Sequence, residues 1–125
     1  MKRYGSLFEE FISFQNLYSA ALRAQRGKRY KSGTAAFNFD LEPNLLKQQN
    51  ALLNGEYKFG KYTSFYVHDP KTRLISAAPY CDRLVHHALC NIIEPIFEKS
   101  FIYDLYSNRK DKGTHKAIDR YQKFC

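Results

Sequence analysis

Apolar residues recur at spacings of three and four over the first part of the chain, the period of a helix with one buried face. Ser6 and Glu9 fit a capping box at its start, because the serine hydroxyl can accept from the amide three residues on and the glutamate can reach back. The helix is expected to fade near Gln25 and Gly27. The stripe predicted to be buried consists of Leu7, Phe11, Phe14, Tyr18 and Ala21.

A second helix is predicted after Asp40, which can cap it, with Pro43 near its first turn. Asn54 and Gly55 form its stop signal. An extended segment over residues 57–62 is expected to follow. The apolar face of this helix is predicted to consist of Leu41, Leu45, Leu46, Leu52 and Leu53.

Residues 64–68 and 73–77 have β character, and between them lies a four-residue segment that begins with Asp69 and Pro70. That dipeptide favours a tight turn, so the pattern predicts a β-hairpin with Lys71 at its tip. The period of two in a strand puts alternate side chains on opposite faces. One face is therefore predicted to carry Arg73, Ile75 and Ala77, and the other Leu74 and Ser76.

The clearest helical pattern begins at Pro79 and runs for more than three turns. Asp82 lies near its N-terminal end, where a carboxylate is favoured. Pro95 lacks a backbone donor, which predicts a kink or an early end there. The recurring apolar positions are Val85, Ala88, Leu89, Ile92, Ile93, Ile96 and Phe97.

A cationic turn over residues 108–113 leads to a final helix, which Thr114 can cap. This pattern is still running at Phe124, so we expect the domain to be cut before its natural end. The elements together predict an α+β fold, mostly helical around one hairpin. The inner face of the final helix is predicted to carry Ala117, Ile118, Tyr121 and Cys125.

Composition adds a preference for polyanions. The 125 residues carry 20 Lys and Arg against 12 Asp and Glu, a net charge of +8, and 16% are aromatic. A basic, aromatic-rich domain suggests a nucleic-acid partner, although a merely soluble basic protein has the same charge. No secretory signal and no membrane-length apolar run is visible. Three cysteines without a signal peptide favour a reducing, cytoplasmic location.

Three cationic groups are candidates for phosphate contact. The first lies in the segment 23–31, broken by Gly27, which is either a phosphate-binding loop or a soluble linker. The second is the hairpin pair, where a guanidinium on a strand can grip a triphosphate with two parallel hydrogen bonds. The third lies in the turn before the final helix. Their members are Arg26, Lys28 and Arg29; Lys71 and Arg73; and Arg109, Lys110 and Lys112.

Two other chemistries are less favoured. A helix cannot wrap zinc tetrahedrally with the residues Cys81, His86, His87 and Cys90 alone, so buried or helix-face roles are preferred. Glu94 and Glu98 are spaced as a carboxylate pair, but a solvated helix face explains them better. Composition and spacing alone therefore show no catalytic residue.

Several short blocks resemble, in order, the early conserved blocks of bacterial retroelement reverse transcriptases, with the diversity-generating retroelement and group II intron families nearest. The main block runs without interruption from Pro70 to Leu89 and contains Pro-Lys-x-Arg and Asp-Arg-x-Val. A lead-in of the Leu-x-x-Gly-x-Tyr type precedes it. The resemblance covers roughly residues 45–123. The flanking blocks are Leu53–Tyr57, Ile93–Phe97, Tyr106–Arg109 and Lys112–His115.

The resemblance implies a single N-terminal and fingers region of an RNA-directed DNA polymerase, a nucleotidyltransferase, over residues 1–125. Arg73 stands where the family contacts the incoming nucleotide's triphosphate, and Lys71 occupies the neighbouring lysine slot. His68 stands where group II enzymes favour a further lysine, and a neutral histidine is a poorer phosphate ligand. Arg109 matches an arginine near template and nucleotide, although the serine of that block is replaced.

In the resembling family, the aspartates that hold two Mg²⁺ ions lie beyond the helix that starts near Thr114. We therefore expect the parent enzyme to use Mg²⁺, and this chain alone to bind none and to be inactive. The expected partners are RNA template, DNA primer and dNTP, with self-association through apolar surface exposed by the cut. The alternative is a stand-alone basic RNA-binding module without polymerase activity.

Overall fold

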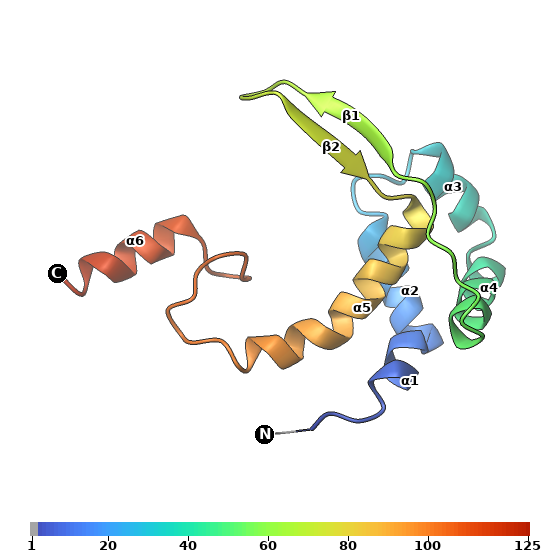
Figure 1. Ribbon diagram of the computed structural model, residues 1–125, viewed down its shortest axis with the longest axis horizontal. Coiled ribbons are helices and arrows are strands. Elements are labelled where there is room, and N and C mark those ends of the chain that lie inside the picture. Colours follow the sequence, from blue (N-terminus) through green and yellow to red (C-terminus); the bar gives the residue numbers. More distant parts are fainter. Residues whose placement is uncertain (1–2) are drawn as a thin grey trace. The chain divides into compact units, whose positions relative to one another are not determined.

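The computed structural model describes residues 3–125, which form six helices and one two-stranded antiparallel sheet (Figure 1). The predicted α+β class is confirmed. The chain divides into two compact units, which meet in sequence between Glu94 and Pro95. In chain order the elements are α1 (Leu7–Ile12), α2 (Phe14–Ala24), α3 (Ser32–Phe39), α4 (Leu41–Leu53), β1 (Thr63–Val67), β2 (Arg73–Ala77), α5 (Tyr80–Glu98) and α6 (Thr114–Gln122).

The single helix predicted at the start is wrong, because the chain breaks at Ser13 into α1 and α2. Ser13 has extended dihedrals (φ −56°, ψ 139°), and its hydroxyl accepts from the backbone N–H of Asn16 at 3.3 Å. A serine that caps a following helix in this way competes with continuation of the preceding one. The predicted capping box is also wrong, since Ser6 makes no side-chain capping bond.

The break changes which residues of the first segment face the core. Ile12 and Leu17 are buried, whereas Tyr18 of the predicted stripe is 39% exposed. Asn16 strengthens the break, because its amide donates to the carbonyls of Phe11 (2.9 Å) and Ala88 (3.0 Å). The predicted stripe fails because it assumes one continuous helix, whereas the chain is interrupted at Ser13 between α1 and α2.

The core of the first unit lies between α2, α4 and α5, with α3 at its edge. Leu17, Leu45 and Leu84 contribute fully buried side chains, one from each of the three helices. Helix α3 was not predicted from the pattern, and it buries Thr34 and Phe37. Helix α4 lies where it was predicted and is followed by Gly55 at φ 68°, although Asp40 makes no side-chain capping bond. Its predicted apolar face is only partly buried, since Leu45 is 0% exposed whereas Leu46 and Leu53 are exposed.

The predicted hairpin is confirmed, and we call β1, β2 and the intervening turn the arm. The strands pair in register with Val67 opposite Arg73 and Phe65 opposite Ile75. Arg73 therefore shares one face with Ile75 and Ala77, as predicted. The Asp69–Pro70 peptide bond in the turn is cis. Residues 61–76 are all exposed, and Figure 1 shows the arm projecting from the helices of the first unit.

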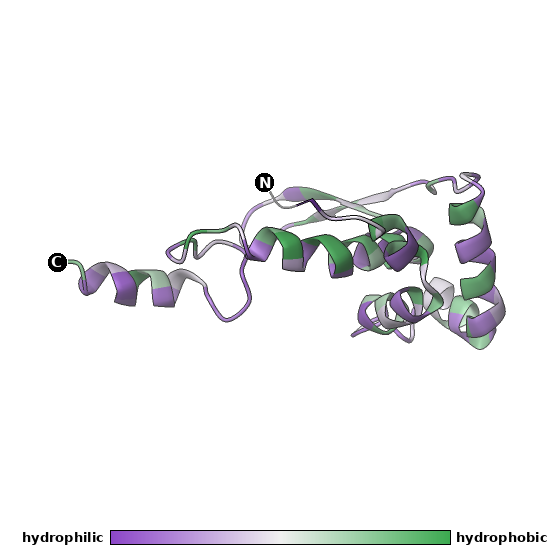
Figure 2. Cartoon of the chain, turned by 90° about the horizontal axis from the view of Figure 1, so that it is seen from below, coloured by the Kyte–Doolittle hydropathy of each residue, from purple (hydrophilic) through white to green (hydrophobic). Residues whose placement is uncertain are grey.

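Helix α5 continues through Pro95 to Glu98, so the predicted early end is wrong. Apolar positions run along this helix (Figure 2). No helix within residues 3–125 is long and apolar enough to cross a membrane.

The second unit consists of the end of α5, a connecting loop and α6. The N-cap of α6 is Gly113 (φ 118°), not Thr114, which is already helical. The predicted inner face is also wrong, since Ile118 and Tyr121 are exposed and α6 buries no residue within the described part of the chain. A helical period shows amphipathicity, but burial requires a partner surface to pack on.

Candidate nucleotide and nucleic-acid interface

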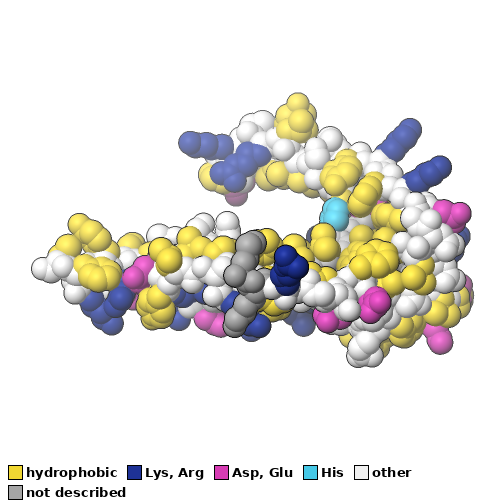
Figure 3. All heavy atoms as spheres, turned by 60° about the horizontal axis from the view of Figure 1, so that its bottom comes forward, with side chains coloured by type: hydrophobic (Ala, Val, Ile, Leu, Met, Phe, Trp, Pro, Cys, Tyr) yellow, Lys and Arg dark blue, Asp and Glu magenta, His cyan; other side chains and the backbone are white. Residues whose placement is uncertain are grey.

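The two cations predicted to hold a triphosphate both lie on the arm. Lys71 is in the turn and Arg73 is the first residue of β2, and both side chains are exposed. Within residues 3–125, neither forms an ion pair or a side-chain hydrogen bond. Figure 3 shows Lys and Arg side chains at the free end of the arm. An unpaired guanidinium on a strand keeps its donors available for an anionic ligand.

His68, which stands in place of a family lysine, is occupied locally within the arm. Its Nδ1 lies 3.2 Å from the Thr72 hydroxyl across the turn, and its ring stacks on Tyr66 with centroids 6.4 Å apart. These contacts give His68 a role in shaping the turn. The cationic side chains of the turn and of β2 are therefore Lys71 and Arg73, respectively.

A buried carboxylate, whose role was not foreseen from the sequence, lies where the arm meets the helices. Asp82 is only 2% exposed. Its Oδ1 accepts from the Tyr57 hydroxyl at 2.5 Å, and its Oδ2 accepts from the Gly60 N–H at 2.9 Å. The predicted position near the N-terminus of its helix is correct, but the partners come from the segment between α4 and β1. A glycine flanked by Phe59 and Lys61 was the available signal for a close backbone approach.

The Asp82 contact changes the acidity of Tyr57. Burial, followed by the hydrogen bond to the Asp82 carboxylate and the nearby negative charge, raises the Tyr57 pKa well above its usual range. Burial also raises the pKa of Tyr80, whose hydroxyl donates to the Ala21 carbonyl at 3.2 Å. Both phenols are therefore held in the protonated form by the folded chain.

The raised Tyr57 pKa predicts a loss of stability in alkali. A group whose pKa is higher in the folded state stabilises folding fully below its unfolded pKa, about 10 for tyrosine, and the contribution is lost as pH rises through the folded value. Titrating tyrosinate absorbance should therefore show Tyr57 ionising after the exposed tyrosines. Tyr57→Phe should remove one tyrosine from the late component, to which Tyr80 also contributes. A wild-type titration in which every tyrosine ionises near pH 10 would contradict the assignment.

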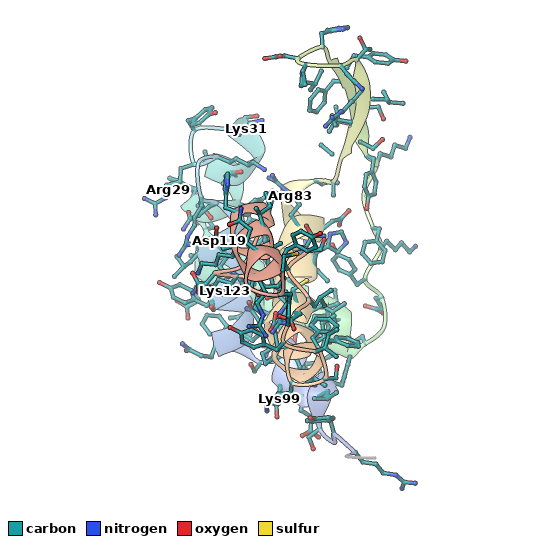
Figure 4. The ribbon with its side chains drawn as sticks, turned by 90° about the vertical axis from the view of Figure 1, so that its left-hand side faces the viewer. Arg29, Lys31, Arg83, Lys99, Asp119 and Lys123 are labelled. Atoms are coloured by element: carbon teal, nitrogen blue, oxygen red, sulfur yellow. The ribbon has the colours of Figure 1, made fainter. Side chains whose placement is uncertain are left out.

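The cationic turn between α2 and α3 is a second exposed group. The turn spans residues 25–31 and carries the exposed Arg26 and Arg29 and the half-buried Lys28. Figure 4 shows Arg29 pointing away from the helices. By contrast, Arg23 at the end of α2 is engaged on α5, where it donates to the Asn91 side chain and lies 3.8 Å from Glu94.

In the second unit, Arg109 has a partner that was not foreseen. Its guanidinium donates to both Glu98 carboxylate oxygens, with Nε distances of 3.0 and 3.1 Å, and to the carbonyls of Ile102 and Leu105. It also lies over the Phe101 ring, and its side chain is only 15% exposed. The hydrogen bonds from Arg109 lower the pKa of the Glu98 carboxyl. Arg109 thus organises the loop between α5 and α6, and its contact with nucleic acid stays a prediction.

The other two cations of this loop differ from each other. Lys112 donates to the Tyr103 carbonyl, and its ammonium lies 4.0 and 4.6 Å from the centroids of the Tyr103 and Tyr106 rings. Lys110 is exposed. Lys112 borders an open hollow of about 260 Å³ together with Lys116, Asp119 and Arg120. The hollow mixes both signs of charge, so it does not define one ligand class.

Neither of the less favoured chemistries gains a site. No group of three or more His, Cys, Asp and Glu side chains that could hold a metal converges anywhere in residues 3–125. Glu94 and Glu98 are each paired with a different arginine. Burial raises the pKa of the Cys81 thiol, which makes it a weaker nucleophile and metal ligand at neutral pH.

Comparison with known proteins gives a distant likeness. No family model matches the chain. The chain is 29% identical over 91 residues to nuclear intron maturase 2, mitochondrial, of Arabidopsis thaliana. The match covers 60% of this chain and 12% of the length of that protein, so the chain spans only a small part of this relative. This likeness loosely supports a relationship to the reverse-transcriptase-related proteins of retroelements.

Proposed function

We propose that this chain is the N-terminal and fingers region of a retroelement reverse transcriptase, and that its arm holds the triphosphate of an incoming dNTP. The observation that carries the proposal is the exposed arm, on which Lys71 and Arg73 have no anionic partner within residues 3–125. The ordered motif blocks and the partial likeness to an intron maturase support the same proposal from the sequence.

In this proposal the arm contributes charge and geometry. Arg73 at the start of β2 offers a planar set of guanidinium donors, which can bind two phosphate oxygens at once. Lys71 in the turn adds a compact positive charge that adapts to the phosphate's position. The cationic turn 25–31 and Lys110 supply backbone-phosphate contacts to template and primer, which are independent of base sequence.

Mg²⁺ chemistry is not assigned to this chain. The metal of template-directed polymerases needs convergent carboxylates, and the described residues hold no such cluster. Asp82, the buried carboxylate nearest the arm, is already bonded to Tyr57 and Gly60. In this proposal the chain contributes contacts to nucleotide and nucleic acid, and the carboxylates that hold Mg²⁺ belong to another part of the parent enzyme.

A nucleotide titration tests this proposal on the chain as it exists. Amide NMR spectra recorded with increasing dNTP should shift mainly at residues 67–74, because the triphosphate is expected at the end of the arm. A deoxynucleoside monophosphate serves as the control and should shift these amides less, since it offers fewer charged oxygens. Salt-dependent RNA binding with no triphosphate-dependent shift on the arm would overturn the proposal in favour of a stand-alone RNA-binding module.

A further inference from the structure

The arm receives no side support from the helices. Residues 63–76 of the arm are all exposed, and its side-chain hydrogen bonds stay within the arm, as between Ser64 and Ser76 (3.1 Å). Within residues 3–125, no ion pair and no side-chain hydrogen bond joins this segment to a helix. The direction in which the arm projects must therefore be set where its two ends are attached.

Both attachments converge on the first turn of α5. The strand β2 leads through Pro79 directly into that helix. On the other side, Gly60 donates its N–H to Asp82, and it lies so close to Pro79 that an added Cβ would be 2.8 Å from the proline Cγ. The segment before β1 thus packs closely against Pro79, which lies between β2 and α5.

Aromatic contacts continue this attachment along α5. Phe59 meets Tyr57 edge-on, with ring centroids 5.3 Å apart, and it stacks on His86 at 6.1 Å. His86 lies one helical turn after Asp82, so the segment 57–60, which we call the stem, follows one face of α5. The hydrogen bonds at Asp82 are the polar part of this contact.

We propose that Asp82 is a positioning residue that fixes the direction of the arm. Its two carboxylate oxygens bind one donor each from the stem. Their release would remove the polar contacts of the stem with α5 and leave the Phe59–His86 stacking and the close approach of Gly60 to Pro79, which are less directional. The β1–β2 ladder would persist, because its hydrogen bonds are internal to the arm. The functional consequence, correct presentation of Arg73, rests on the proposed function, whereas the mechanical role of Asp82 does not.

Residual dipolar couplings and hydrogen exchange test this role in the intact chain without nucleotide. In the wild type, the couplings of the β1–β2 amides should fit the same alignment tensor as α5 up to Glu94. In Asp82→Asn, which replaces one acceptor oxygen with a donor amide, the couplings of the arm should shrink and no longer fit that tensor. The Gly60 amide should exchange about tenfold faster, as expected for one lost hydrogen bond to a charged group.

Two further variants separate positioning from general stability. Tyr57→Phe removes one donor and leaves the Asp82 carboxylate, so it should change the arm couplings in the same direction but by less. If Asp82→Asn fails to fold, Tyr57→Phe tests the proposal in its place. Asp40 is an exposed carboxylate at the start of α4, so Asp40→Asn should change neither the arm couplings nor the exchange rate of the Gly60 amide. Unchanged arm couplings in both Asp82→Asn and Tyr57→Phe would overturn the proposal. So would loss of protection in α2 and α4 together with the stem, because that pattern marks a core-stabilising group.

The outcome is separable from that of the proposed function. Arm couplings that respond to Asp82→Asn support the positioning role even if the arm binds no dNTP. If dNTP shifts the arm amides in the wild type and Asp82→Asn weakens that binding, both inferences hold. If dNTP binds and the arm couplings are insensitive to Asp82, only the positioning role fails.

Discussion

Arg73→Ala is expected to weaken dNTP binding by the chain about 10- to 150-fold. A charge-assisted hydrogen-bonding contact contributes about 1.5–3 kcal/mol, and this exposed guanidinium has no competing partner within the described residues. The effect should appear in the nucleotide titration as a higher Kd with the arm still folded. In a full-length enzyme that contains this segment, the same substitution should raise the KM for dNTP or lower kcat.

The controls for Arg73 separate geometry from charge. Arg73→Lys keeps the charge and loses the planar fork, so it should restore only part of the affinity. Lys47→Ala removes an exposed cation from α4 and should leave dNTP affinity within about twofold, because exposed charges at a distance are screened by salt. Equal affinities of wild type and Arg73→Ala would remove Arg73 from the proposed role.

Leu84→Ala is expected to lower the free energy of unfolding by about 2–5 kcal/mol. The Leu84 side chain is 0% exposed and packs among α2, α4 and α5, so truncation loses apolar burial and leaves a cavity. Chemical denaturation followed by circular dichroism measures the change. Both attachments of the arm lie on α5. Leu84→Ala should therefore also weaken nucleotide binding under conditions in which the variant is partly unfolded.

Leu89→Ala is the matched control on the same helix. Leu89 is 44% exposed, so its truncation should cost less than about 1 kcal/mol. The pair tests whether the core is where the structure places it, because the sequence pattern put Leu89 on the apolar stripe and did not include Leu84, whereas the structure buries Leu84 and exposes Leu89. Similar losses for the two variants would contradict the placement of Leu84.

The hairpin and the longer helices were predictable because their signals are local. Alternation around Asp69 and Pro70 specifies two strands with a tight turn, and the register then places Arg73 on the face of Ile75. The period of three and four after Pro79 likewise identifies α5. The error at Pro95 has a physical reason, since a proline near a helix end removes only one hydrogen bond and the helix can continue for a few residues.

The contacts of individual polar groups were less predictable, because they join residues far apart in sequence. The pattern identified Arg109 as a cation in a loop, but its partner Glu98 lies 11 residues earlier at the end of α5. It identified Asp82 as a favourable charge near a helix start, but Tyr57 and Gly60 lie 25 and 22 residues away. The periodicity runs through Ser13 without a break, whereas in the structure the Ser13 hydroxyl accepts from the Asn16 N–H and caps a new helix.

Periodicity, turn residues and charge alone thus determined the α+β class, the arm and the presence of cations on it. The tertiary structure decided which of those cations are free, which apolar stripes are buried and what holds the arm to α5. The physical reason is that propensity and alternation act over a few neighbouring residues, whereas burial and hydrogen-bond pairing depend on which distant surfaces meet. Asp82 illustrates this contrast. The sequence identified its charge near a helix start, whereas its hydrogen bonds to Tyr57 and Gly60 depend on how the stem folds against α5.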